Sequence, residues 1–411
     1  MNIKKIILTT HKSLVLFVSL FALNFQSVAQ IQNPTGQDAN NRVITTAVPF
    51  LSITPDSRSG GMGDAGVAIS PDANSTYWNP SKLAFIDNQM GFSLSYSPWL
   101  AKIINDMSLS YLSGYYKITR EQAVAVSLRY FDLGEIFFTD DQNNPQGDFN
   151  PKEFAFDATY ARMLSEKFSL GITIRYVNSN LTGYYQTATI AAKPANTVAT
   201  DVSAFYQTDT KIGNLAFGGN ISNIGAKVTY SDQKNKDFIP TNLRLGSALT
   251  TEIDPYNKIT FALDFNKLLV PTPPIYLTDA NGAILTDADG KYIITSSSKD
   301  PDRNLLSGMF GSFSDAPNGF SEEIQEVMIS AGAEYWYNQL FAARLGYFYE
   351  QANKGNRQYF TLGVGFRYNV FGFDFAYLIP PKQEHPLAET LRFTLHFNFE
   401  EESVFEESVT D

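Results

Sequence analysis

Residues 55–83 read PDSRSGGMGDAGVAISPDANSTYWNPSKL, and they stand directly before a long series of alternating apolar and polar residues. The stretch is rich in glycine and other small residues and contains no long apolar run. Glycine permits tight turns and close approach of neighbouring backbone. We therefore predict that this stretch forms a compact plug, around which the following strands close as a β-barrel. The residues expected to build the plug are Arg58, Gly60, Gly61, Gly63, Asp64, Gly66, Tyr77, Trp78, Asn79 and Pro80.

The glycines also allow a nucleotide-binding interpretation. The segment Gly61–Gly66, GMGDAG, fits the dinucleotide pattern G-x-G-x-x-G. Such a site needs an amphipathic helix after the glycines, because the phosphates bind at its N-terminus. Pro71 and Pro80 leave little room for that helix, and no alternation of strands and helices follows. The pattern therefore favours a compact irregular segment, and we expect no cofactor.

The start of the chain has the three parts of a secretory signal peptide, predicted over residues 1–29. A basic beginning is followed by an apolar run over Ser13–Phe25 and by a small-residue cleavage site that ends at Ala29. The apolar run is too short for a membrane-spanning helix, which needs about 20 residues. The chain has no cysteine, which excludes a lipoprotein anchor and disulfides. We expect an exported envelope protein whose mature chain begins at Gln30.

Composition narrows the class of protein. Aromatic residues make up 14% of the chain, with 32 Phe and 22 Tyr, whereas charged residues make up only 18%. The formal net charge of -11 argues against nucleic acid as a partner, because nucleic-acid surfaces attract basic proteins. An exported, aromatic-rich chain without apolar helices is typical of an outer-membrane barrel, whose strands give a weak hydropathy signal.

From Gln89 onward apolar and polar residues alternate with period two, which is the period of β-strands. Near the end of the chain Leu391 and Phe393 share one face, and Arg392 and Thr394 share the other. Apolar residues facing lipid and polar residues facing a lumen form the barrel pattern, although a soluble sandwich also alternates. The fourteen candidate strands are Gln89–Trp99, Asp106–Lys117, Gln122–Phe131, Lys152–Met163, Phe168–Val177, Asp201–Gln207, Asn214–Ile221, Thr241–Glu252, Lys258–Asn266, Glu326–Trp336, Leu340–Tyr349, Arg357–Tyr368, Phe371–Leu378 and Glu389–Phe399.

The connections between these candidates sort by length. Those after even-numbered strands are short, such as Leu164–Lys167 and Asn369–Val370, whereas most after odd-numbered strands are longer, such as Asp132–Pro151 and Asn178–Thr200. Bacterial outer-membrane barrels have short periplasmic turns, long outer loops and an even strand number. A sandwich gives no reason for such sorting. We therefore predict an all-β fold: a membrane-spanning antiparallel β-barrel of about 14 strands in the cell outer membrane.

The predicted barrel occupies residues 89–399. It follows a polar lead and the plug over residues 30–88, and it precedes an acidic tail over residues 400–411. A barrel of this size has a lumen wide enough to leak unless something fills it, which gives the plug a physical role. Because the plug precedes the first strand, we expect it to enter the lumen from the periplasmic side.

Two motifs in the plug carry a family resemblance. SGGMGDAGVA at residues 59–68 and D-x-N-S-x-Y-W-N-P at Asp72–Pro80, followed by the fourteen strands, resemble the FadL-like outer-membrane family. Within that family the sequence is most similar to the members that serve the type IX secretion system of Bacteroidetes. The resemblance covers essentially the whole mature chain.

The resemblance implies a barrel that is not an enzyme. It implies association with a large translocon barrel protein at its lateral opening, and contact with outer-membrane lipid. Such members receive exported proteins through their C-terminal signal domains and deliver them to a surface attachment complex that contains a peptidase. FadL-type transporters instead pass hydrophobic small molecules through a gap in the barrel wall, which is the alternative function.

Other candidate sites have weak support in the sequence. His396 falls on the predicted lumen face, so a lumenal lipid hydrolase is conceivable, but no local motif supports it. No cysteine and no histidine pair at ligand spacing is present, so we expect no metal site. Thr286–Gly290 has some likeness to a calcium loop, but together with the similar Thr278–Gly282 it predicts two turns of a loop hairpin.

The connection Lys267–Gln325 is the most promising binding region. It is far longer than ordinary connections, and such loops are usually functional or disordered. Its apolar residues could contact a protein partner. They could equally fold back as a lid over the barrel mouth. The residues concerned are Met309, Phe310, Phe313 and Phe320.

Overall fold

The computed structural model describes residues 42–399, apart from positions 105, 140–141, 184, 187–190, 232–235, 280–282, 289, 382–385 and 388–389. The predicted signal peptide, residues 30–41 of the polar lead and the acidic tail lie outside the described residues. Among the residues that are described, no helix is both long and apolar enough to cross a membrane.

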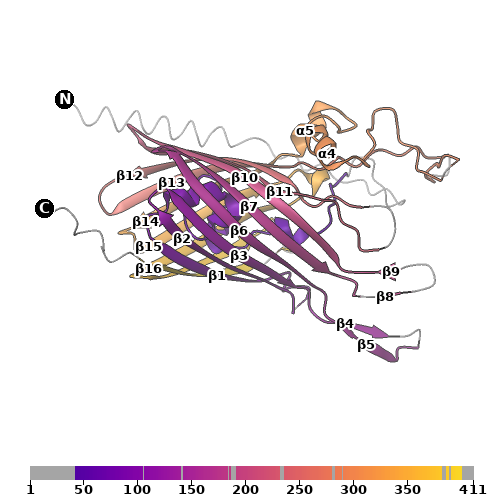
Figure 1. Cartoon of the computed structure of the whole chain (residues 1–411), viewed down its shortest axis with the longest axis horizontal. Coiled ribbons are helices and arrows are strands. Elements are labelled where there is room, and N and C mark those ends of the chain that lie inside the picture. Colours follow the sequence, from indigo (N-terminus) through magenta and orange to yellow (C-terminus); the bar gives the residue numbers. More distant parts are fainter. Residues whose placement is uncertain are drawn as a thin grey trace. The chain divides into compact units, whose positions relative to one another are not determined.

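Fourteen antiparallel strands form one closed barrel, which confirms the predicted fold class (Figure 1). Neighbouring strands follow the order β1-β18-β17-β16-β15-β14-β13-β12-β11-β10-β7-β6-β3-β2. These strands are β1 (Met90–Pro98), β2 (Ser108–Thr119), β3 (Gln122–Asp132), β6 (Lys152–Ser165), β7 (Phe168–Asn180), β10 (Ala195–Thr210), β11 (Gly213–Gly225), β12 (Asn242–Glu252), β13 (Asn257–Leu268), β14 (Met328–Tyr337), β15 (Phe341–Tyr349), β16 (Gln358–Tyr368), β17 (Phe371–Ile379) and β18 (Leu391–Phe399).

Every barrel strand lies where the sequence predicts one, and most ends agree within a few residues. The largest difference is β10, which begins at Ala195 rather than Asp201 and so reaches further into the outer loop. Two small hairpins in the outer loops were not predicted. They are β4 (Ile136–Thr139) with β5 (Pro145–Phe149), and β8 (Tyr185–Gln186) with β9 (Ala191–Ala192).

The two faces of the wall differ in chemistry. On β1, Ser93 and Ser95 are buried in the lumen, whereas Phe92, Leu94 and Tyr96 are exposed on the outside. The register pairs Phe92 with Phe397 of β18, so large outward side chains stack across neighbouring strands. Apolar-out and polar-in alternation is therefore present in the wall, as a barrel in a lipid bilayer requires.

The two ends of the barrel differ in their connections. At one end the strands are joined by short turns, such as the two residues Asn369 and Val370 between β16 and β17. Asn369 has a φ of 51°, which suits the left-handed position of a tight hairpin. At the other end lie the two small hairpins and the helices α4 (Leu305–Gly311) and α5 (Phe320–Gln325) (Figure 1). Short turns mark the periplasmic end and long loops the outer end.

The segment from residue 42 to residue 89 runs down the lumen from the outer end to the periplasmic end. It contains η1 (Pro49–Ser52), α2 (Ser57–Gly60), α3 (Ser75–Trp78) and η2 (Pro80–Phe85). Near its start, Phe50 stacks on Phe131 at the outer end of β3, with ring centroids 6.5 Å apart. Near its end, Lys117 Nζ at the periplasmic end of β2 donates to the Ile86 carbonyl at 2.6 Å.

This path corrects the expectation that the plug enters from the periplasmic side. The first described residues lie at the outer mouth, where Arg42 pairs with Glu322 of α5 and the Ala47 amide donates to the Phe238 carbonyl at 2.9 Å. The place of the plug in the sequence determines only where the plug ends, because its last residue must lead into β1. Its beginning is set by contacts with outer-loop residues that are remote in sequence.

The connection between β13 and β14 is folded. Isolated bridges Thr278↔Ile284 and Thr286↔Tyr292 flank the two turns that the sequence predicts. After them come α4 and α5, and Asn304 begins α4 by accepting a hydrogen bond from the Ser307 amide at 2.9 Å. A further short helix, η3 (Ala352–Lys354), lies in the loop between β15 and β16.

Candidate functional site

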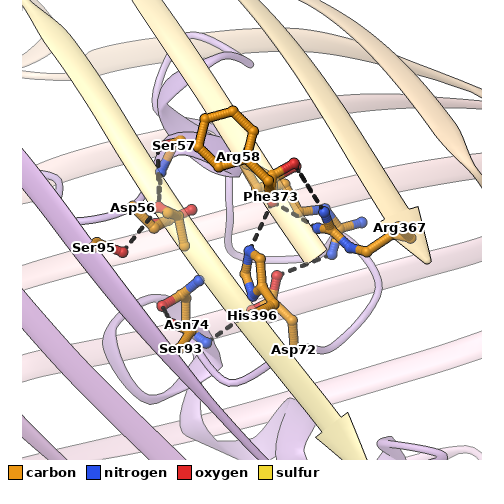
Figure 2. A network of polar contacts seen from close by, with 12 residues as sticks. Asp56, Ser57, Arg58, Asp72, Asn74, Ser93, Ser95, Arg367, Phe373 and His396 are labelled. Atoms are coloured by element: carbon orange, nitrogen blue, oxygen red, sulfur yellow. Dashed lines mark hydrogen bonds and ion pairs between the residues drawn. The ribbon is translucent and has the colours of Figure 1, made fainter. Parts of the chain in front are cut away.

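Arg58 of α2 joins the plug to the barrel wall. Its Nε and Nη2 donate to the two carboxylate oxygens of Glu334 on β14, at 3.0 and 2.8 Å. Its Nη1 also donates to Asp72 of the plug at 3.1 Å (Figure 2). Bidentate arginine–carboxylate pairs combine strength with fixed geometry. The pair therefore fixes both the position and the orientation of α2 inside the barrel.

The pair is the start of a longer chain of charges along the wall. Arg344 Nε of β15 also donates to Glu334, at 2.7 Å, and its Nη1 donates to Asp374 of β17 at 2.8 Å. Asp374 further accepts from Arg367 at 2.6 Å and lies 2.7 Å from His396 Nε2. Figure 2 shows Arg58 and Asp72 of the plug together with Arg367 and His396 of the wall. All of these carboxylates and cations have partners, which buried charges require.

Asp64 makes a second connection between plug and wall. Its two carboxylate oxygens accept from Arg392 Nη1 of β18 at 2.8 Å and from the Tyr359 hydroxyl of β16 at 2.6 Å. Further along the wall, Asp264 of β13 accepts from the amides of Gly66 and Val67 at 2.7 and 2.9 Å. The plug is thus attached to strands on several sides of the barrel.

The plug glycines lie where another side chain would not fit. A Cβ on Gly63, whose φ is 68°, would come within 2.5 Å of the Tyr347 backbone nitrogen on β15. A Cβ on Gly66 would collide with the Trp78 ring, and one on Gly61 would lie 3.0 Å from the Cα of Gly363. A Cβ on Gly60 would instead meet the side chain of Arg392, 2.5 Å from its Nη1. The glycines therefore allow close packing of backbone on backbone, and no helix of eight or more residues follows them in the described chain.

The aromatic end of the plug forms a compact cluster. The Tyr77 ring lies between the guanidinium groups of Arg129 and Arg244, 4.6 and 4.4 Å from its centre. Trp78 donates from Nε1 to Asp56 at 2.6 Å. Arginine stacked on an aromatic face adds attraction when both are shielded from water. The cluster therefore fixes the position of two lumenal arginines and attaches the end of the plug to the wall.

Asn79 and Pro80 form the beginning of η2. The Asn79 side chain accepts from the Ser81 amide at 3.2 Å and donates to the carbonyls of Val67 and Ala204 at 3.1 Å each. Pro80 occupies the first helical position, where no amide hydrogen is needed. This motif connects the plug to β10 and completes the set of predicted plug residues, all of which the structure brings together inside the barrel.

A cavity of about 700 Å³ remains between the plug and the outer mouth. Tyr77 and Trp78 of the plug line it together with Arg244 and Arg392 of the wall, and Lys354 of η3 lies on its outer side. Buried side-chain atoms of three lining residues lack a hydrogen-bond partner among the described residues. These atoms are Asn242 Oδ1, Asn266 Oδ1 and Arg392 Nε.

Acidic residues of α5 fix the outer loop to the rim. Lys267 Nζ at the end of β13 contacts Glu323 and Glu326 at 3.0 and 2.6 Å. Lys354 Nζ contacts Glu322 and Glu326 at 2.6 and 2.8 Å. These lysines bring the loop end back to the rim of the barrel.

The charges around Glu322 affect its protonation. Burial by itself raises the pKa of the Glu322 carboxyl, but hydrogen bonds from Arg42 and Lys354 outweigh burial and hold that pKa below its usual value. Burial is the larger influence at Asp315 in the same loop and raises its pKa. Protonation of Glu322 therefore lowers the stability of the folded loop, whereas protonation of Asp315 raises it.

The four apolar loop residues singled out in the sequence have different surroundings. Met309 is buried, with 5% of its surface exposed, whereas Phe310 is 73% exposed on the same helix. Phe313 and Phe320 are exposed too, and both line a groove against the outside of the barrel. Their role as partner contacts stays a prediction, and Phe310 is the residue best placed for it.

Sequence reasoning missed Glu334 and Asp264, the wall carboxylates that bind the plug, and Arg344 and Asp374, which continue the chain of charges from Glu334. A signal for them exists, because each is a charged residue on the polar face of an alternating strand. A charge in that position must be paired within the lumen. The partner of each charge could not be found, since pairing depends on the shear of the closed barrel.

Two alternative sites receive no further support. The described residues contain no group of three or more His, Asp or Glu that could hold a metal ion. His396 lies on the lumen face as predicted, and its Nε2 contacts Asp374, a carboxylate already paired with Arg344 and Arg367.

Several solved structures resemble this chain. They include the toluene transporter TbuX of Ralstonia pickettii (TM-score 0.47, 12% identity, covering 84% of this chain and 98% of that one). Another is the monoaromatic hydrocarbon channel CymD (TM-score 0.48, 14% identity, 84% and 98%). A third is a FadL homologue of Pseudomonas aeruginosa (TM-score 0.45, 11% identity, 87% and 100%). Likeness at this level says nothing about what this chain binds.

No curated protein matches the sequence. A family model described as "Type IX secretion system protein PorV" matches residues 36–275, which is more than half of the 411-residue chain. The chain belongs to the PorV family of type IX secretion system proteins.

Proposed function

We propose that this outer-membrane barrel acts in type IX secretion without being an enzyme. It engages the translocon barrel, receives exported proteins through their C-terminal signal domains and delivers them to the surface attachment complex that contains a peptidase. Membership of the PorV family supports a role in this secretion system. The partners and the order of contacts are our proposal.

The observation that carries the proposal is the filled lumen. Arg58, Asp64 and Asp264 connect the plug to the four strands β14, β16, β18 and β13, and Gly61 and Gly63 pack directly on wall backbone. A polypeptide could not pass through this barrel while the plug is in place. Exported proteins must therefore be handled at the outside of the barrel, by its loops and rim.

The outer end offers apolar residues suited to a protein partner. On α4, Leu306 and Phe310 are 60% and 73% exposed. On the β4–β5 hairpin, Phe137 and Phe138 are also exposed. Exposed apolar groups gathered at one end of a molecule are typical of interaction sites. The two segments lie on opposite sides of the outer end (Figure 1), and the partner surface that we propose consists of Leu306 and Phe310 on α4.

The proposal can be tested by affinity purification from native outer membranes in mild detergent, followed by mass spectrometry. The unmodified chain should retain a very large barrel protein or exported proteins that share a C-terminal domain. The double variant Leu306→Asp, Phe310→Asp should lose them. Ile253→Asp is the matched control, because Ile253 is 63% exposed in a periplasmic turn. Equal recovery of partners with both variants would contradict the proposed surface, and recovery of the barrel alone from unmodified membranes would contradict the secretion role.

A second candidate function is transport of hydrophobic small molecules, which the lumenal cavity favours. The cavity combines the aromatic rings of Tyr77 and Trp78 with Arg244 and Arg392, a lining suited to an amphipathic molecule. Lipid-like molecules that co-purify with the barrel in place of proteins would support this candidate. A lumenal hydrolase would lose its remaining support if His396→Ala left lipid composition unchanged.

A further inference from the structure

An apolar groove of about 230 Å³ lies on the outer wall of the barrel, beside helix α5. The wall contributes outward-facing residues of β12 and β13, and the loop contributes residues of α5 and of the segment before it. Apolar residues make up most of the groove's lining, among them Leu243, Leu245, Phe265, Phe313, Phe320 and Ile324.

The strand register places the groove on the outside. Leu245 of β12 lies opposite Phe265 of β13, and both side chains are exposed. Their chain neighbours Arg244 and Asp264 are buried in the lumen. Because successive side chains of a strand point to opposite faces, Leu245 and Phe265 must face away from the lumen. The floor of the groove is therefore part of the membrane-facing wall.

Lys267 shows that α5 lies close to this outer face. It pairs in register with Leu243, so it belongs to the same outward row as Phe265, yet only 7% of its surface is exposed. Glu323 of α5 and Glu326 at its end lie against the lysine Nζ, at 3.0 and 2.6 Å. These ion pairs fix the helix at the rim, with Phe320 and Ile324 beside the wall.

The row of wall residues continues from the groove towards the middle of the barrel. Phe261 and Leu263 follow on the outward face of β13 and are both exposed. In the outer membrane this face contacts lipid acyl chains. The groove is thus the outer end of an established lipid-facing surface, covered on one side by loop residues that are 78% (Phe320) and 57% (Ile324) exposed.

We propose that the groove binds an acyl chain of an outer-leaflet lipid, so that α5 rests on the membrane. Burial of apolar side chains under a hydrocarbon chain is favourable, at roughly 25 cal/mol per Å² of apolar surface. A peptide would bring backbone amides and carbonyls that need hydrogen-bond partners. The side chains that line the groove are apolar except for Asn266, Lys267 and Glu323, and the last two already pair with each other. Such a lining suits a lipid chain better. This assignment does not depend on the proposed role in secretion.

A tryptophan-quenching experiment tests the proposal. The full-length protein is reconstituted into phosphatidylcholine vesicles whose acyl chains do or do not carry bromine, a short-range quencher. Ile324→Trp introduces an indole in the groove, and Leu306→Trp introduces one on α4, at a residue that is equally exposed but does not line the groove. Emission of the unmodified chain, which has three Trp, is subtracted. Each variant is shown to be folded by gel electrophoresis, in which the unheated barrel migrates differently from the heat-denatured chain.

The indole of Ile324→Trp should lose most of its fluorescence in brominated vesicles, and that of Leu306→Trp should not. The added substitution Phe320→Asp should abolish the difference, because the carboxylate disfavours an acyl chain in the groove. If neither indole is quenched, the groove does not hold lipid. If the first indole is shielded only after outer-membrane proteins are added, the occupant is a protein and the proposal is wrong.

Discussion

The plug and the connection between β13 and β14 are both irregular segments that fold against the same barrel, but they use their apolar residues in opposite ways. In the plug, Met62, Val67 and Leu83 are completely buried. In the outer connection, α5 is attached through buried charges, while Phe310 and Phe320 stay exposed. Charges position both segments, but the plug buries its large apolar side chains, whereas the connection buries Met309 and leaves its phenylalanines exposed.

The difference indicates which segment is fixed and which is available for binding. A segment that packs glycine on backbone and pairs each charge has little reason to leave its place, since every contact would be lost at once. A segment that keeps apolar side chains exposed retains the ability to bury them against something else. The predictions below separate these two kinds of segment, beginning with the largest expected effect.

The first prediction concerns Arg58→Ala, which removes the plug residue between Glu334 and Asp72. Loss of one partner from a buried ion pair typically costs about 3–5 kcal/mol. Here Asp72 would lose its ion pair, and Glu334 would keep only Arg344. The plug should loosen, which can be measured as a lower free energy of unfolding in urea and as ion conductance through the reconstituted barrel. Lys291→Ala removes an exposed ion pair with Asp300 and should cost only about 0–1 kcal/mol. Equal stability of the two variants would mean that Arg58 does not fix the plug.

The contrast between the two segments also explains what could be predicted from the sequence. The barrel strands can be predicted from the alternation of apolar and polar residues and from the alternation of short and long connections. Both are local features of the sequence, and all fourteen strands were found. The plug residues follow from composition. The path of the plug did not, because Arg42 and Ala47 contact outer-loop residues that lie about two hundred to three hundred positions away. The separate surroundings of Met309 and Phe310 were also missed, since they depend on how α4 packs.

The second prediction uses Gly63→Ala, a change of one methyl group. The new Cβ would come within 2.5 Å of the Tyr347 backbone, at a residue whose φ of 68° already disfavours alanine. Overpacking of this kind typically costs about 1–3 kcal/mol. Gly114→Ala on β2 is the control, because its Cβ would find its nearest neighbours at 3.6 Å. Urea unfolding of both variants measures the difference, and an unchanged midpoint for Gly63→Ala would show that the plug can shift to make room.

The third prediction concerns the response of the outer loop to acid. The folded state lowers the pKa of Glu322 below its ordinary value of 4.5, so the stability it contributes is present above that value and is lost as the pH falls through the folded pKa. The raised pKa of Asp315 has the opposite sign and strengthens the loop as acid is added. The protection factors of the α5 amides, which correct exchange rates for the intrinsic pH dependence of amide exchange, should therefore fall only at low pH.

Glu322→Gln isolates the contribution of that carboxyl. The variant cannot titrate at this position, so its α5 amides should be less protected from hydrogen exchange than those of the unmodified helix at neutral pH. Their protection should also fall by less when the pH is lowered. If the two proteins exchange equally at neutral pH, Arg42 and Lys354 do not hold the loop through Glu322.

The smallest effect on stability is expected for Phe310→Asp. The side chain is 73% exposed, and substitutions at such surface positions usually change the free energy of unfolding by less than about 0.5 kcal/mol. Its neighbour Met309 is buried, so Met309→Asp should loosen the loop and lower its protection from proteolysis. Near-native stability of Phe310→Asp together with loss of co-purifying proteins would identify an apolar residue kept exposed for binding. A marked loss of stability would instead place Phe310 among the residues that hold the loop together, and the distinction between the plug and the loop would weaken.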